Sequence, residues 1–233
     1  MVKLNTILLK ISGESLSGDQ EHGLDNDVLH SLSLVIKKVI ALGIKVGIVV
    51  GGGNFWRGRS NSHMGRVTAD HMGMLATTIN ALALADALDQ VGVDTRVQNA
   101  IQMQQICEQY IRKRAVRHLE KDRVVIFAGG TGNPYFTTDS AAALRALEIG
   151  ADAVLKATMV DGVYDRDPQI DRQAEKYKEI SFDDVLSKNL KVMDATAVAL
   201  CRDNDIPVIV FNISDPENIY RLAAGQNVGT LIS

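Results

Sequence analysis

Phe127-Ala128-Gly129-Gly130-Thr131-Gly132-Asn133-Pro134-Tyr135-Phe136-Thr137-Thr138-Asp139 is the stretch that decides the fold. It continues an apolar segment, Arg123–Phe127, that predicts a buried β-strand, and it leads into an alanine-rich helix expected from Asp139. Glycines let backbone N–H groups approach an anion closely, and a helix start adds unpaired N–H groups and a positive dipole end. This order of elements indicates a phosphate-binding turn, although an ordinary helix N-cap at Thr138 explains the turn alone equally well.

Two other predicted strands end in similar loops. Lys45–Val50 is followed by Gly51-Gly52-Gly53-Asn54-Phe55-Trp56-Arg57, and Thr6–Ile11, which carries Lys10, is followed by Ser12-Gly13-Glu14. Ligands of an open parallel sheet bind at the carboxyl ends of its strands, so the three loops are expected to share one crevice. Arg57 offers bidentate phosphate contacts. The motifs G-x-x-x-x-G-K-[ST] and G-x-G-x-x-G are both missing from the sequence, which argues against a P-loop enzyme and a dinucleotide-binding dehydrogenase.

Bulk properties exclude several classes of protein. At 233 residues the chain is expected to form a single domain, residues 1–233. A formal net charge of −3 gives no general basic field, so nucleic acid is not an expected partner. Cys107 and Cys201 lack metal-ligand spacing, and no apolar run approaches the ~18 residues of a membrane span. These features favour a cytoplasmic protein without membrane contact.

Strands and helices alternate along the chain. The further strands are expected at Thr95–Gln98, Ala153–Ala157, Pro207–Asn212 and Gly229–Ile232, and the helices at Asp27–Leu42, Ala69–Val91, Met103–Tyr110, Asp139–Ile149, Ser181–Leu186, Asp194–Asn204 and from Ser214 onward. Alternation with nearly continuous apolar strands predicts an α/β fold with a largely parallel central sheet covered on both faces.

The expected helix Ala69–Val91 is apolar around most of its circumference. Its apolar residues include Ala76, Ala81, Leu82, Leu84, Ala85 and Leu88. Such a helix must be covered on every side. It therefore either lies deep in the core or packs its second face against another subunit.

A further segment follows the strand Ala153–Ala157. It carries Lys156 at the strand's end, Tyr164 as an aromatic ring able to stack on a base, and Asp167 as a carboxylate able to hold ribose hydroxyls. A plain turn at Asp167-Pro168 and a half-buried loop tyrosine explain the same residues.

Five motifs together resemble the bacterial uridylate (UMP) kinases, which belong to the amino-acid kinase fold family. They are Lys10-Ile-Ser-Gly-Glu, Gly51-Gly-Gly-Asn, Asp70-His-Met-Gly-Met-Leu-Ala-Thr, Gly130-Thr-Gly-Asn-Pro-Tyr-Phe-Thr-Thr-Asp and Lys156-Ala-Thr-Met-Val-Asp-Gly-Val-Tyr. They occur in order along nearly the whole chain. The resemblance implies a three-layer αβα sandwich (amino-acid kinase or carbamate kinase-like), the partners ATP and UMP, the cofactor Mg²⁺, and the reaction UMP + ATP → UDP + ADP.

The resemblance also implies residue roles, with the acceptor bound mainly by the N-terminal part and the ATP nucleoside mainly by the C-terminal part. Residues implied to bind ATP are Lys10, Ile11, Ser12, Gly13, Gly53, Arg57, Thr158, Tyr164 and Asp167. Residues implied to bind UMP are Gly52, Asp70, Thr131, Gly132, Asn133, Pro134, Tyr135, Phe136, Thr137 and Thr138. The implied catalytic residues are Lys10, Asp139 and Arg57, with Asp139 orienting the cations around the transferred group. No protein ligand of Mg²⁺ is assigned. Asp194 also matches a family position, but helix N-capping explains it equally well.

Quaternary structure and regulation follow from the same resemblance. The family is typically hexameric, which suits the apolar Ala69–Val91 segment, and many members are activated by GTP and inhibited by UTP. The segment Gly18-Asp19-Gln20-Glu21-His22-Gly23 falls in the family's GTP-linked region, although its interior residues differ from the family pattern. The alternatives are a kinase for an amino-acid or carbamate acceptor and a non-catalytic nucleotide sensor or storage protein on the same fold. Lys10 and Asp139 argue against the last, because a sensor could lose them without penalty.

Overall fold

A central sheet organises the molecule. The computed structural model describes residues 4–56, 64–168, 170–171 and 173–233. Within these residues the strand order is β4-β3-β5-β2-β1-β6-β8-β9-β7. Neighbouring strands are parallel except for β8 and β9, which are antiparallel. The strands are β1 (Thr6–Ile11), β2 (Lys45–Val50), β3 (Thr95–Asn99), β4 (Glu108–Gln109), β5 (Val124–Ala128), β6 (Ala153–Thr158), β7 (Glu179–Ile180), β8 (Val208–Asn212) and β9 (Thr230–Ile232). The predicted largely parallel α/β sheet is confirmed.

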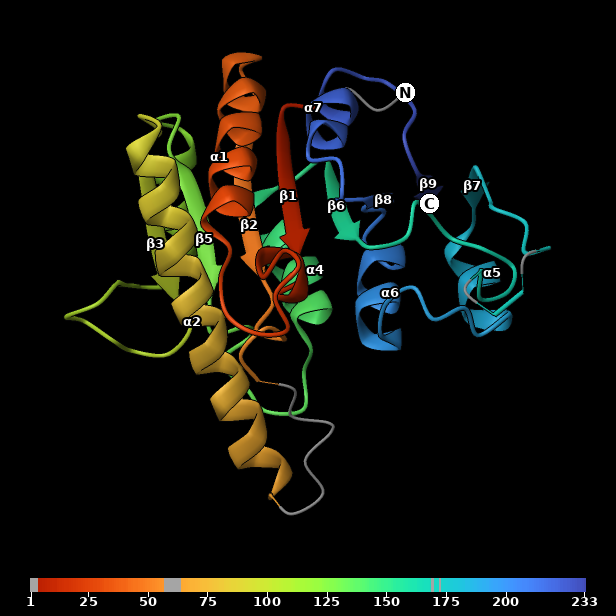
Figure 1. Ribbon diagram of the computed structural model, residues 1–233, viewed down its shortest axis with the longest axis horizontal. Helices are drawn as coiled ribbons and strands as arrows, with labels where there is room; N and C mark the ends of the chain where they lie inside the picture. The colour runs from red at the N-terminus through yellow and green to blue at the C-terminus, as the bar shows by residue number, and fades with distance from the viewer. Residues whose placement is uncertain (1–3, 57–63, 169, 172) are drawn as a thin grey trace.

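Helices cover both faces of the sheet, which completes three layers (Figure 1). One face carries α1 (Asn26–Ala41), α2 (Arg66–Gln90) and α7 (Glu217–Ala223). The other carries α3 (Arg112–Leu119), α4 (Thr138–Ile149), α5 (Phe182–Ser187) and α6 (Ala195–Arg202). A short 3₁₀ turn, η1 (Glu14–Leu16), follows β1. No helix among the described residues is both long and apolar enough to cross a membrane.

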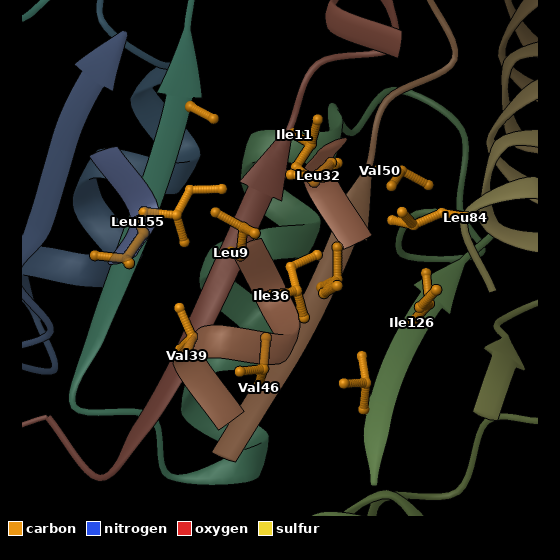
Figure 2. Packing of buried hydrophobic residues seen from close by; sticks show 14 of the residues in the cluster. Leu9, Ile11, Leu32, Ile36, Val39, Val46, Val50, Leu84, Ile126 and Leu155 are labelled. Atoms are coloured by element: carbon orange, nitrogen blue, oxygen red, sulfur yellow. The ribbon is translucent and has the colours of Figure 1, made fainter. Parts of the chain in front are cut away.

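The alternation of side chains along β1 determines which residues face the core and which face the site. Leu9 and Ile11 pack with Leu32 and Ile36 of α1 in one apolar cluster (Figure 2). Leu8 belongs to the opposite cluster, which contains the alanines of α4. Successive residues of a strand point to opposite faces, so Lys10 shares the α4 face with Leu8. The same alternation places Lys156 of β6 on that face.

The expected helix Met103–Tyr110 is wrong. After a turn in which the N–H groups of Ile106 and Cys107 both donate to the Met103 carbonyl, residues Glu108–Gln109 form strand β4 beside β3. Strand pairing wins here because the Tyr110 N–H donates to the Asn99 carbonyl, which continues the ladder to β3. The helix begins only at Arg112, and its first turn is exposed to solvent.

Candidate active site

Two lysines on adjacent strands meet one carboxylate at the start of α4. Lys10 of β1 and Lys156 of β6 are register partners, so their side chains leave the sheet next to each other. Lys10 Nζ lies 2.8 Å from Asp139 Oδ1, and Lys156 Nζ lies 2.6 Å from Asp139 Oδ2. With all three groups ionised the cluster carries one net positive charge. Taken alone, this Lys10–Asp139–Lys156 cluster therefore has a net charge that attracts an anion, and the neighbouring Asp194 carboxylate offsets part of that charge at Lys156.

Burial strengthens the interactions within the cluster. The side chains of Lys10, Asp139 and Lys156 are 10%, 14% and 8% exposed. Burial alone would raise the pKa of Asp139, but the ammonium groups of Lys10 and Lys156 outweigh it and hold that pKa below its usual value. Burial lowers the pKa of Lys156, and Asp139 only partly compensates. Lys156 Nζ also donates a hydrogen bond to the Val192 carbonyl.

The first turn of α4 brings backbone N–H groups to the same place. Thr137 is the N-cap, and its Oγ1 accepts hydrogen bonds from the N–H groups of Asp139 at 3.1 Å and Ser140 at 3.3 Å. Thr138 is the first helical residue, so the cap lies one residue before the position considered from the sequence. The positive end of the α4 dipole therefore adds to the two ammonium groups.

A cleft of about 160 Å³ lies beside this helix start. Seven of the residues predicted to bind the acceptor line it: Gly52, Asp70, Thr131, Asn133, Phe136, Thr137 and Thr138. The cleft is completed mainly by α2 and the glycine-rich loop after β2. Gly132, Pro134 and Tyr135 belong to the same turn without being part of this lining, and Tyr135 is 66% exposed.

Asp70 joins α2 to the turn formed by residues 131–138. Its Oδ2 accepts a hydrogen bond from the Tyr135 N–H at 2.7 Å and lies 2.7 Å from Arg66 Nε. Arg66 also lies over the Tyr135 ring, with its Cζ 5.4 Å from the ring centroid. Behind the turn, the Gly129 N–H donates to Thr77 Oγ1 at 2.9 Å. Two residues of α2 thus contact this loop at two separate points, Gly129 and Tyr135.

The glycines after β1 and β2 serve the packing of the chain against itself. A Cβ atom on Gly13 would lie 2.5 Å from the Gly53 nitrogen, and one on Gly52 would lie 2.9 Å from the Gly73 carbonyl oxygen of α2. Side chains at these positions would therefore push the loops apart. Ile11 is fully buried and its side chain packs in the apolar cluster with α1, so the structure gives it no direct access to a ligand.

The predicted nucleoside-binding residues lie along the segment that follows β6. Thr158 ends β6 and its Oγ1 donates to the Val160 carbonyl at 2.7 Å. Tyr164 OH donates to Asp161 Oδ1 at 2.6 Å, and Asp167 is exposed. Arg57, predicted as both catalytic and ATP-binding, lies outside the described residues.

The predicted effector segment is linked to the glycine-rich loop. The Gly23 N–H donates to the Asn54 carbonyl at 3.1 Å, and Asn54 Nδ2 donates to the Gly23 carbonyl at 2.7 Å. Asn54 also exchanges side-chain hydrogen bonds with Asn80 of α2. The residues 18–23 are mostly exposed.

Sequence reasoning gave no role to Lys156 and Arg66. The sequence shows Lys156 at the end of a strand, but its partnership with Lys10 depends on β1 and β6 being neighbours. Arg66 could have been found from its spacing, because Arg66 and Asp70 lie four residues apart on one helix face.

Comparisons with known proteins agree with this fold. The model of the amino acid kinase family matches residues 5–212. The structure of UMP kinase from Bacillus anthracis superimposes with a TM-score of 0.95 at 38% sequence identity, covering 99% of this chain and 96% of that one. UMP kinase from Ureaplasma parvum gives a TM-score of 0.93 at 42% identity over 99% of both chains. Uridylate kinase from Archaeoglobus fulgidus gives 0.75 at 29% identity, covering 97% of this chain and 99% of that one.

The fold, the charged cluster and these relatives define the class of protein: an α/β phosphotransferase with its site at the carboxyl ends of parallel strands. The chain belongs to the amino acid kinase family.

Proposed function

We propose that the protein transfers the γ-phosphoryl group of ATP to the phosphate of UMP and forms UDP and ADP. The observation that carries the proposal is the Lys10–Asp139–Lys156 cluster at the start of α4, next to the cleft that contains Asp70. A phosphate oxygen of UMP would form the new bond to the γ-phosphorus, while the bond from that phosphorus to the bridging oxygen of ADP breaks. The attacking phosphate is already charged at neutral pH, so the reaction needs positioning and charge stabilisation more than a general base.

Lys10 is the residue best placed to follow the transferred group. Its Nζ lies 2.8 Å from Asp139 Oδ1, and this ion pair leaves other N–H groups of the ammonium unused by Asp139. Lys10 is thus held by charge and can turn its N–H groups toward a phosphate. Asp139 then keeps both ammonium groups in place and remains ionised because its pKa is lowered. Arg57 would add a further cation.

The acceptor would occupy the cleft. Its phosphate would lie at the turn 131–138 and the start of α4, where the positive end of the helix dipole favours an anion although the Asp139 and Ser140 N–H groups already donate to Thr137. Asp70 would contact the ribose, and the remaining acceptor contacts would come from Gly52 and the turn. ATP would lie against Lys10 to Gly13, Gly53 and the segment with Thr158, Tyr164 and Asp167, all within one catalytic domain.

The site also fits Mg²⁺ carried by ATP. Among the described residues no three His, Cys, Asp or Glu side chains are grouped to hold a metal ion, and both Asp139 oxygens already face ammonium groups. This donor set suits an ion that is bound mainly by the ATP phosphates and that neutralises charge on the transferred group.

A coupled assay of ADP production tests the proposal. The purified protein is given Mg·ATP with UMP, CMP, N-acetylglutamate or carbamate in turn. We expect turnover with UMP and little turnover with N-acetylglutamate or carbamate. Turnover with one of those acceptors instead would identify an amino-acid or carbamate kinase. Tight nucleotide binding without turnover of any acceptor would identify a sensor or storage protein.

Oligomerisation and effector control belong to the same proposal. We infer a cytoplasmic homo-oligomer, a hexamer, activated by GTP through the segment 18–23 and inhibited by UTP. The hydrogen bonds between Gly23 and Asn54 support the proposed role of the segment 18–23 in activation, because they connect this segment to the glycine-rich loop after β2. Initial rates measured across a GTP titration test the activation, and rates that do not change with GTP concentration would refute it.

A further inference from the structure

Asp194 connects the starts of two helices beside the Lys10–Asp139–Lys156 cluster. It is the N-cap of α6, where its Oδ1 accepts a hydrogen bond from the Ala197 N–H at 3.0 Å. The same oxygen accepts from Ser140 Oγ at 2.8 Å, and Oδ2 accepts from Thr137 Oγ1. Thr137 and Ser140 belong to the first turn of α4, which carries Asp139. A cap for α6 alone needs only the bond from Ala197, so the two bonds to α4 require another explanation.

The hydroxyl of Thr137 is fully committed by this arrangement. Its one hydrogen is donated to Asp194, and its oxygen accepts from the N–H groups of Asp139 and Ser140. Thr137 therefore transmits the position of Asp194 to the backbone of Asp139. It has no hydroxyl hydrogen left to donate to a substrate, which makes its side chain a support of the turn rather than a phosphate donor.

The segment that carries Asp194 also holds Lys156. The Val192 carbonyl, two residues before Asp194, accepts a hydrogen bond from Lys156 Nζ. Lys156 Nζ in turn lies 2.6 Å from Asp139 Oδ2. Asp194 thus fixes one end of the Asp139–Lys156 pair through α4, and its own segment fixes the other end.

We propose that Asp194 is a positioning residue for phosphoryl transfer, which fixes Asp139 between Lys10 and Lys156 by holding the first turn of α4. This inference deepens the proposed function and rests on it. It assigns Asp194 a role beyond capping α6. Because an error of about 1 Å in a reacting geometry can cost up to ~100-fold in rate, a residue that only supports the carboxylate can still control turnover.

The variant Asp194→Asn tests the inference. The asparagine keeps an oxygen for Ala197 and Ser140, but its amide group would donate where Asp194 accepts from Thr137. We expect kcat with UMP to fall at least about tenfold, while the KM values for UMP and ATP change less than about threefold. We also expect its kcat effect to be non-additive with Thr137→Val, since both variants break the same connection.

Two comparisons separate positioning from loss of folding. Ser140→Ala removes one bond to Asp194 and keeps the carboxylate, so it should lower kcat partially even if Asp194→Asn is poorly folded. Asp215→Asn is the matched control, because Asp215 accepts from the Glu217 N–H at the start of α7, away from the cluster. Its kcat should remain that of the wild type.

A crystal structure of Asp194→Asn gives a readout that does not depend on the acceptor. We expect the distance from Lys156 Nζ to Asp139 Oδ2 to change, and an unchanged pair would overturn the inference. Unchanged kcat in a folded Asp194→Asn, or additive effects with Thr137→Val, would also overturn it. Absence of UMP turnover in the wild type would instead refute the proposed function, and the structure of the variant would still decide the role of Asp194.

Discussion

Two ammonium groups and one carboxylate lie almost sealed from water in this protein, and such groupings are costly to bury. Apolar residues of similar volume would stabilise a purely structural site at least as well. Lys10 and Lys156 share the Asp139 carboxylate, and the Asp194 carboxylate also acts on Lys156, so Lys10 is the ammonium group left to meet an arriving anion. The energetics of these residues therefore support a phosphate-handling site.

Replacing Lys10 by alanine removes the cation that faces the transferred phosphate in our proposal. We expect Lys10→Ala to lower kcat by more than about tenfold, which corresponds to ~1.4 kcal/mol of barrier. Lys38→Ala is the control, because Lys38 is an exposed helix lysine paired with Glu217. Steady-state assays with UMP check both variants, and near-wild-type turnover in Lys10→Ala would refute the role of Lys10.

Asp139 should make stability depend on pH in the acid range. Its pKa is lowered in the folded protein, so its contribution is fully present above the unfolded pKa, near pH 4, and is lost as the pH falls through the folded value. At pH 7 we expect Asp139→Asn to cost about 3 kcal/mol, because it leaves two buried lysines without their partner.

Urea denaturation of wild type and Asp139→Asn between pH 7 and pH 3 measures this effect. The two free energies of unfolding should converge as the pH falls. Asp184→Asn is the control, since Asp184 pairs with Lys188 in solvent and the loss of this pair should hardly change the free energy of unfolding. A difference that stays constant throughout would contradict the assignment.

Residue types at strand ends were enough to predict Lys10, Asp139 and the turn 131–138 as one region, because parallel strands end at the same edge of a sheet. The partnership of Lys10 with Lys156 was not predictable in this way. It depends on β6 crossing back to lie beside β1, which local sequence does not specify.

Helix α4 is held by side-chain contacts at both of its ends. Its start is held through Thr137 and Ser140. Near its end, Glu148 Oε2 accepts from Tyr110 OH at 2.6 Å and lies 2.5 Å from Arg145 Nη1. Arg145 is only 4% exposed and stacks on the Tyr110 ring. Arg145 Nη2 also reaches the Gly130 carbonyl at 3.4 Å, so this end of α4 also contacts the start of the loop that follows β5.

The variant Glu148→Ala tests how much the contacts of Glu148 with Arg145 and Tyr110 contribute to the stability of the protein. It leaves the buried Arg145 guanidinium without its carboxylate, and we expect a loss of about 3 kcal/mol in the free energy of unfolding. Glu120→Ala, which breaks the exposed pair with Arg117, should change stability by less than ~1 kcal/mol. Chemical denaturation of both proteins gives the comparison, and equal losses would contradict a buried ionic anchor.

The wrong helix at Met103–Tyr110 shows where element prediction fails. Apolar residues at helical spacing were present, but Ile106 is 57% exposed and the backbone of the following residues pairs with β3. Pairing with the nearby strand β3 overrode the helical pattern of these residues. Most other elements were predicted because their apolar runs are long and end at glycines or polar turns.

Helix α2 presents an apolar surface that this chain leaves exposed. Ala81, Leu84 and Leu88 are buried against the sheet, whereas Val67, Leu75 and Ile79 are 42%, 49% and 47% exposed. Leu75 lies eight residues after Val67, and Ile79 lies four residues after Leu75, so consecutive members of the three lie on the same side of the helix. This supports the proposed contact with a second copy of the chain.

Sedimentation velocity at micromolar concentration tests the contact. We expect the wild type to be an oligomer and Ile79→Glu to shift it toward monomer, because a carboxylate would be buried without a partner. Leu42→Glu changes a residue of similar exposure, 44%, at the end of α1 and should keep the wild-type state. A monomeric wild type would refute the proposal.

Both described borders of the sheet are formed by two-residue strands, β4 on one side and β7 on the other. Strands this short offer few free backbone groups to a neighbouring chain, so they guard against uncontrolled ribbon-like aggregation. Growth of the sheet from one molecule into the next is thereby discouraged. Any ordered assembly is then directed to the helical layers, where contact between side chains, rather than a repeating backbone ladder, decides which partner fits.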